Sequence, residues 1–139
     1  MTSKHQFAYA SFAIYQNVEP PAFWTRYFAV TPDSAGVKGE RFITPSGRMS
    51  AGARPIGLWS VSSTAAVASD ELAPHLRYLV KLLALPRADL PKLVSLTNAR
   101  MRFFCYWDNE TGDRAPDVPD DIRAMMEALG GTIEIDEYR

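Results

Sequence analysis

The sequence predicts an α+β domain of two layers, in which helices cover one face of a largely antiparallel sheet. Two observations lead to this prediction. Several stretches alternate apolar and polar residues with a period of two, as half-buried strands do. Between them, apolar residues recur at helical spacing. The resulting order, β-α-β-β-α-α-β-α-β, is compatible with a ferredoxin-like portion. At 139 residues, we expect one domain that spans 1–139.

Five stretches are predicted to be strands, at residues 7–15, 37–43, 56–62, 100–107 and 132–138. The second and third are expected to pair as a hairpin. The third carries apolar residues on both sides of its alternation, which predicts an interior position in the sheet because an edge strand seldom buries both faces. Residues 44–55 combine prolines, glycines and serines without periodicity, and we expect a loop there.

Four helices are predicted from apolar stripes together with their start and stop signals. A short helix follows Pro21, because proline fits a first helical turn. The main helix is expected to open at Asp70 or Glu71 and to end before Pro86. A further short helix is expected after Asp89. The last helix ends at Gly130, a residue type that favours helix C-termini.

Composition and charge exclude several classes of protein. Fifteen basic residues stand against sixteen acidic ones, for a net charge of −1. This balance disfavours nucleic acid as a partner, because a backbone binder carries a basic excess. The single cysteine, Cys105, allows no internal disulfide and indicates a reducing compartment, which we take to be the cytoplasm. No apolar run approaches the ~20 residues of a membrane span, and the apolar N-terminal stretch is interpreted as a strand rather than a signal peptide.

No motif assigns a catalytic residue, a cofactor or a metal. His5 and His75 lack further ligand types at metal-binding spacing, and we expect His75 on a helix surface or half-buried. Cys105 shares a strand face with apolar neighbours, which predicts a buried, inert thiol. The acidic clusters at residues 108–113 and 117–121 and near the C-terminus are typical of solvated turns and a helix start.

The alternation also predicts which residues lie on the sheet face away from the helices. Tyrosine, tryptophan and arginine are enriched at interface hot spots, and an exposed aromatic patch is costly in water. The alternative is that the 44–55 loop or the chain ends fold over this face. The predicted interaction surface consists of Tyr9, Trp59, Arg100, Arg102, Phe104, Tyr106 and Tyr138, with Phe7 on the same face.

Three functions follow as hypotheses. The first is a non-enzymatic interaction module that uses this face to form a homodimer or to bind a protein partner. The second is a binder of a small ligand or of single-stranded nucleic acid, because open sheet aromatics can stack bases. The third is an enzyme with an anion site at the 44–55 loop, although no nucleophile and base pair is recognisable. The loop candidates are Lys38, Glu40, Arg48 and Arg54.

Several motifs together resemble the bacterial family called domain of unknown function 4279. The most specific are Lys38-Gly39-Glu40 and Gly57-Leu58-Trp59-Ser60. Less specific matches are the opening strand from Tyr9 to Ile14, Thr31-Pro32, His75-Leu76 and Leu129-Gly130. The resemblance covers nearly the whole chain. It implies a small α+β bacterial domain without established catalytic residues, and a loose association of some relatives with immunity-like or accessory interaction roles.

Overall fold

The computed structural model describes residues 8–44 and 46–138. In this part of the chain, strands and helices follow one another in the order predicted from the sequence. The elements are β1 (Ala8–Tyr15), α1 (Pro21–Phe28), β2 (Ser34–Gly36), β3 (Leu58–Ser62), α2 (Leu72–Leu82), α3 (Leu90–Leu96), β4 (Arg100–Asp108), α4 (Asp120–Leu129) and β5 (Thr132–Tyr138).

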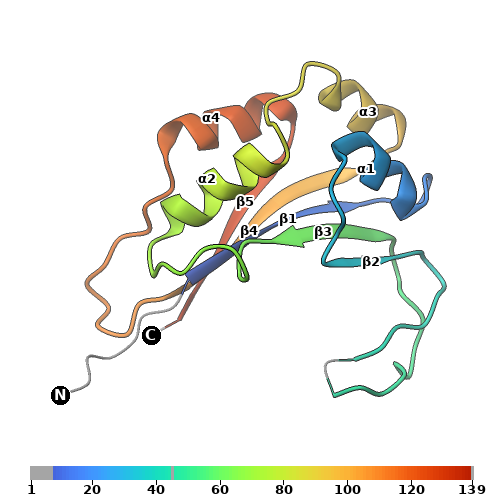
Figure 1. Ribbon diagram of the computed structural model, residues 1–139, viewed down its shortest axis with the longest axis horizontal. Coiled ribbons are helices and arrows are strands. Elements are labelled where there is room, and N and C mark those ends of the chain that lie inside the picture. Colours follow the sequence, from blue (N-terminus) through green and yellow to red (C-terminus); the bar gives the residue numbers. More distant parts are fainter. Residues whose placement is uncertain (1–7, 45, 139) are drawn as a thin grey trace.

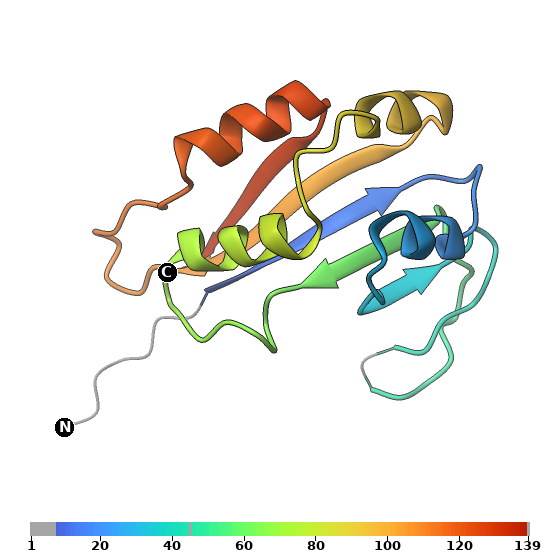
Figure 2. The ribbon, with the colours of Figure 1, turned by 45° about the horizontal axis from the view of Figure 1, so that its top comes forward.

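The strands form one open sheet in the order β2-β3-β1-β4-β5. All neighbours are antiparallel except β4 and β5, which run parallel. The part from β1 to β4 therefore has the split β-α-β arrangement of a ferredoxin-like fold, to which α4 and β5 add a parallel edge strand. The four helices lie on one side of the sheet (Figures 1 and 2). The predicted α+β class and the interior position of β3 are confirmed.

The core lies between the sheet and this helical layer. Three tryptophans and the helix-facing residues of β1 and β4, among them Phe12 and Phe103, are almost completely buried. Trp59 of β3 stacks on Phe28 of α1, with ring centroids 5.1 Å apart. Its indole N–H donates to the hydroxyl of Thr25 at 3.0 Å. Aromatic packing and this hydrogen bond together hold α1 against the sheet.

The prediction of a strand at residues 37–43 is wrong, because these residues form turns and loop with one isolated bridge residue, Ile43. β2 ends at Gly36 and pairs with β3, so the hairpin exists but its first strand lies earlier in the chain. Gly39 adopts a left-handed conformation (φ 90°), and the N–H of Glu40 donates to the carbonyl of Val37 at 3.1 Å. A positive φ cannot continue an extended strand. The chain then enters the loop predicted at 44–55, whose described residues contain no helix and one isolated bridge, from Ile43 to Met49.

The predicted helix boundaries agree closely with the structure. Pro21 is the first residue of α1, and Glu71 is the N-cap of α2. Gly130 ends α4 in the left-handed conformation (φ 85°) that glycine adopts at low cost. Among the described residues, no helix combines the length and the apolar character that crossing a membrane requires.

Candidate interaction surface

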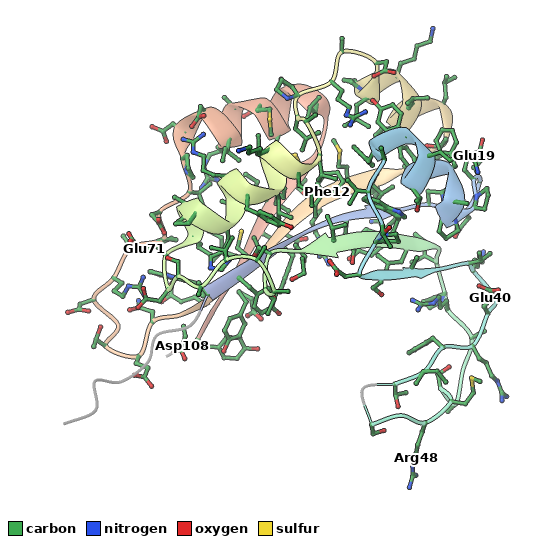
Figure 3. The ribbon with its side chains drawn as sticks, in the orientation of Figure 1. Phe12, Glu19, Glu40, Arg48, Glu71 and Asp108 are labelled. Carbon is green, nitrogen blue, oxygen red and sulfur yellow. The ribbon has the colours of Figure 1, made fainter. Side chains whose placement is uncertain are left out.

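The side of the sheet opposite the helices carries a second set of side chains, here called the open face. No described helix lies on that side (Figures 1 and 3). The strand register places these side chains in rows across β1, β4 and β5. The open face comprises Tyr9, Ser11, Ala13, Tyr15, Leu58, Ser60, Ser62, Arg100, Arg102, Phe104, Tyr106, Asp108, Thr132, Glu134, Asp136 and Tyr138.

Three tyrosines form one row across the open face. The rings of Tyr9 and Tyr106 stack with centroids 5.2 Å apart, and Tyr138 continues the row 4.9 Å from Tyr106. Burial and then the neighbouring Tyr106 and Asp136 raise the pKa of Tyr9. A hydrogen bond to Asp136 raises the pKa of Tyr138. The Tyr9 and Tyr138 hydroxyls therefore remain neutral at physiological pH.

Arg102 is held in a fixed position on the same face, separated from the tyrosine row by the row that contains Phe104. Its guanidinium donates to the Glu134 carboxylate at 2.5 Å and to the Tyr15 hydroxyl at 2.6 Å. It also lies over the rings of Phe104 and Tyr15, at 5.3 and 5.1 Å. Burial alone lowers the pKa of Arg102, but the bond to Glu134 and the neighbouring Tyr15 outweigh it, so the pKa is raised. Cation–π contacts and a charge-assisted bond thus pre-organise this side chain.

A pocket of about 590 Å³ opens at the end of the open face that holds the two arginines. A smaller pocket of about 240 Å³ adjoins it and shares Tyr15, Ile56 and Arg100. Arg100 and Arg102 are the cationic side chains of the larger pocket, and Glu134 is its acidic one. An arginine-lined pocket of this size suits a small anion.

The structure gathers six of the seven predicted surface residues on one face, but Trp59 is not among them. Trp59 is buried against α1. Its register partner is Ile14, a core residue, so both point toward the helices. The placement of Trp59 on the interaction surface was therefore wrong. Phe7, predicted on the same face, lies outside the described residues.

The structure brings two of the four loop candidates together, because the N–H of Arg54 donates to the carbonyl of Glu40 at 2.7 Å, but all four do not form one site. Lys38, Glu40 and Arg48 are exposed. Arg48 projects from the far end of the loop, away from the sheet (Figure 3). Arg54 instead lies over the ring of Phe42 at 4.7 Å. Neither pocket described above is lined by Arg48 or Arg54.

A buried pair that sequence reasoning missed joins Ser63 to His75. The Ser63 hydroxyl lies 2.7 Å from Nδ1 of His75, whose Nε2 lies 2.7 Å from the carbonyl of Ser69. A carbonyl only accepts, so in the neutral imidazole Nε2 carries the proton and Nδ1 accepts from Ser63. Ser63 and His75 are 0% and 1% exposed. The expectation that His75 lies at the surface or half-buried is therefore wrong, and the pair links the sheet to α2 out of reach of a substrate.

The thiol of Cys105 is buried among the core side chains, as predicted. Burial raises its pKa to about 12, so it stays a neutral, unreactive thiol at physiological pH. Across residues 8–44 and 46–138, no three histidine, cysteine or acidic side chains come together as a metal site would need. His5 lies outside these ranges.

These features define a class: a small α+β domain with a ferredoxin-like portion, a helical layer on one side of its sheet and an aromatic, charged sheet face on the other. A family model described as a domain of unknown function (DUF4279) matches residues 5–139. The chain therefore belongs to this family, which confirms the resemblance found in the sequence. No curated protein and no solved structure matches the chain.

Proposed function

We propose that this protein is a non-enzymatic interaction module that binds another protein chain through the open face. The observation that supports this most is that a row of stacked tyrosines and a pre-organised Arg102 share one sheet face that no described helix covers. An immunity-like role is one form of this function. A reducing compartment such as the cytoplasm is part of the proposal, because the lone cysteine forms no internal disulfide.

The chemistry of the open face supports this proposal. Tyrosine and arginine are among the side chains that are enriched at binding hot spots. Rings that already stack, and a guanidinium that is already hydrogen-bonded, lose less conformational entropy when a partner binds. Tyr138 is 49% exposed, so its ring retains area to bury.

The test uses one variant on each side of the sheet. Phe104→Glu places a charge in the middle of the open face, and Leu96→Glu is the matched control on the exposed surface of α3. Light scattering reports self-association, and affinity purification with cross-linking from the native host reports other partners. We expect Phe104→Glu, but not Leu96→Glu, to abolish complex formation. A folded Phe104→Glu protein with unchanged complexes would refute the proposal.

A second candidate function is binding of a small anion in the arginine-lined pocket. The observation that favours it is the pocket of about 590 Å³, within the size range of ligand sites. Phenyl phosphate and benzoate are suitable probes, because each joins an anion to a ring that can lie against Tyr15. We expect saturable NMR shifts at Tyr15 and Arg102 that disappear in Arg100→Ala. Shifts that persist in this variant would remove this candidate. A salt-sensitive shift of a labelled oligonucleotide would instead indicate single-stranded nucleic acid.

A further inference from the structure

Charge on the open face is divided along the strand direction. Arg100 and Arg102 lie toward one end, and Asp108 and Asp136 lie toward the other. Arg100 and Asp108 are the two ends of β4, about 27 Å apart at about 3.4 Å per residue. In the part of the chain that the structure describes, neither takes part in an ion pair. The face therefore has a basic end and an acidic end.

We infer that the open face binds a second copy of this chain, face to face, around a two-fold axis that runs across the strands at Phe104. The inference rests on the proposed function and names its partner. A two-fold rotation about this axis reverses the strand direction of the second copy. The basic end of each protomer then lies over the acidic end of its partner, so Arg100 faces Asp108 twice by symmetry.

The centre of the face fits this arrangement. Phe104 is the middle residue of β4 and would pack against its own equivalent on the axis. Glu134 lies in the same row, but Arg102 at 2.5 Å already compensates its charge. Arg102 would meet the tyrosine row and Asp136 of the partner. Sheets that pack face to face lie about 10 Å apart, with about 30° between their strand directions. An arginine side chain is long enough to reach across this distance.

The edge of the sheet is a poorer route to self-association than the face. Pairing two β5 strands side by side would bring together Glu134, Asp136 and Glu137 of both copies. Like charges on paired strands are destabilising, and charge on an edge strand opposes such pairing. The open face instead places opposite charges at both ends of the contact.

The size of the face sets the expected affinity. Four strands about 4.8 Å apart, with an average length of about 25 Å, cover about 470 Å². This is well below the roughly 800 Å² per partner of a standard interface, so we expect a weak dimer with a dissociation constant in the micromolar range.

The experiment exchanges the charges at the two ends of the face and measures self-association of the full chain by sedimentation equilibrium. The protein concentration runs from low to several hundred micromolar. Arg100→Glu and Asp108→Arg each create two repulsive contacts in a homodimer, and each should weaken self-association by about tenfold or more. Mixed in equal amounts, the two variants should dimerise with near wild-type affinity. In the mixed dimer, the new carboxylate faces the new guanidinium and the remaining pair is native. Arg123→Glu, on the helical side, is the matched control and should change nothing.

Restoration by mixing also shows that both variants fold, which a loss of dimer alone would not. A wild-type chain that stays monomeric at several hundred micromolar would overturn the inference. So would two weakened variants that fail to restore each other. If the wild type is monomeric but binds a different protein in a manner sensitive to Phe104→Glu, the inference falls and the proposed function stands. If Phe104→Glu changes no association at all, both fall.

Discussion

Replacing Ser63 with alanine tests whether its contact with His75 is structural. The Ser63 hydroxyl accepts a hydrogen bond from the backbone N–H of Ala10 at 3.0 Å, and it donates to Nδ1 of His75 at 2.7 Å. The carbonyl of Ala10 already accepts from the N–H of Ser63 at 2.9 Å. The Ser63 hydroxyl is therefore the acceptor for the Ala10 N–H, while the Ser63 N–H bonds to the Ala10 carbonyl.

The expected magnitude follows from the groups left behind. Ser63→Ala leaves two buried polar groups unsatisfied, the Ala10 N–H and Nδ1 of His75. Each such group costs about 1–3 kcal/mol, so we expect the free energy of unfolding to fall by about 2–6 kcal/mol. His75→Leu removes one of the two groups. Ser63→Ala should therefore cost about 1 kcal/mol less in the His75→Leu background than in the wild type.

Urea unfolding followed by tryptophan fluorescence measures this directly. With a slope of about 2 kcal/mol per molar urea, the midpoint should fall by about 1–3 M. Ser62→Ala is the matched control, because the Ser62 hydroxyl bonds only to the neighbouring Thr64 among the described contacts. A loss below about 1 kcal/mol for Ser63→Ala would refute the conclusion that this substitution leaves two buried polar groups unsatisfied. Labelling of Ser63 in the folded protein by a serine-directed fluorophosphonate would refute the conclusion that the pair is inaccessible.

Three further predictions concern the core. Gly57→Ala should destabilise the protein by at least about 2 kcal/mol in urea unfolding, because an added Cβ would lie 2.2 Å from the backbone oxygen of Gln16; an unchanged midpoint would contradict that close approach. Trp59→Ala should cost about 3–5 kcal/mol and Trp59→Phe less, since phenylalanine keeps the stacking on Phe28 but loses the bond to Thr25; equal losses would be inconsistent with this packing. The raised pKa of Cys105, about 12 against 9.0, means that the folded state holds its proton longer than the unfolded state. The contribution of the Cys105 thiol to the free energy of unfolding is complete below pH 9 and is lost as the pH rises toward 12, at about 1.4 kcal/mol per pH unit. Cys105→Ala should therefore flatten the fall in stability at alkaline pH. An unaltered dependence of stability on pH would count against the buried thiol.

Much of the candidate surface could be predicted because side chains alternate along a strand. Once β4 is recognised, Arg100, Arg102, Phe104 and Tyr106 must share one face, whatever surrounds them. Helix positions were predictable for a similar reason, since proline and glycine act locally on the backbone. The prediction failed at residues 37–43, where the alternation was short and the left-handed Gly39 ended the extended run.

The local pattern of this sequence determined the kinds of elements, their order and the composition of each strand face. Only the tertiary structure decided which faces lie together, because that depends on strand register and not on spacing along the chain. The pairing of β3 with β1 places Trp59 opposite Ile14, so its side chain points into the core. The pairing of β4 with β5 places Glu134 close enough to Arg102 to form an ion pair. The same long-range packing buried His75 against Ser63, since a hydrogen bond between distant segments leaves no periodic signal in the sequence.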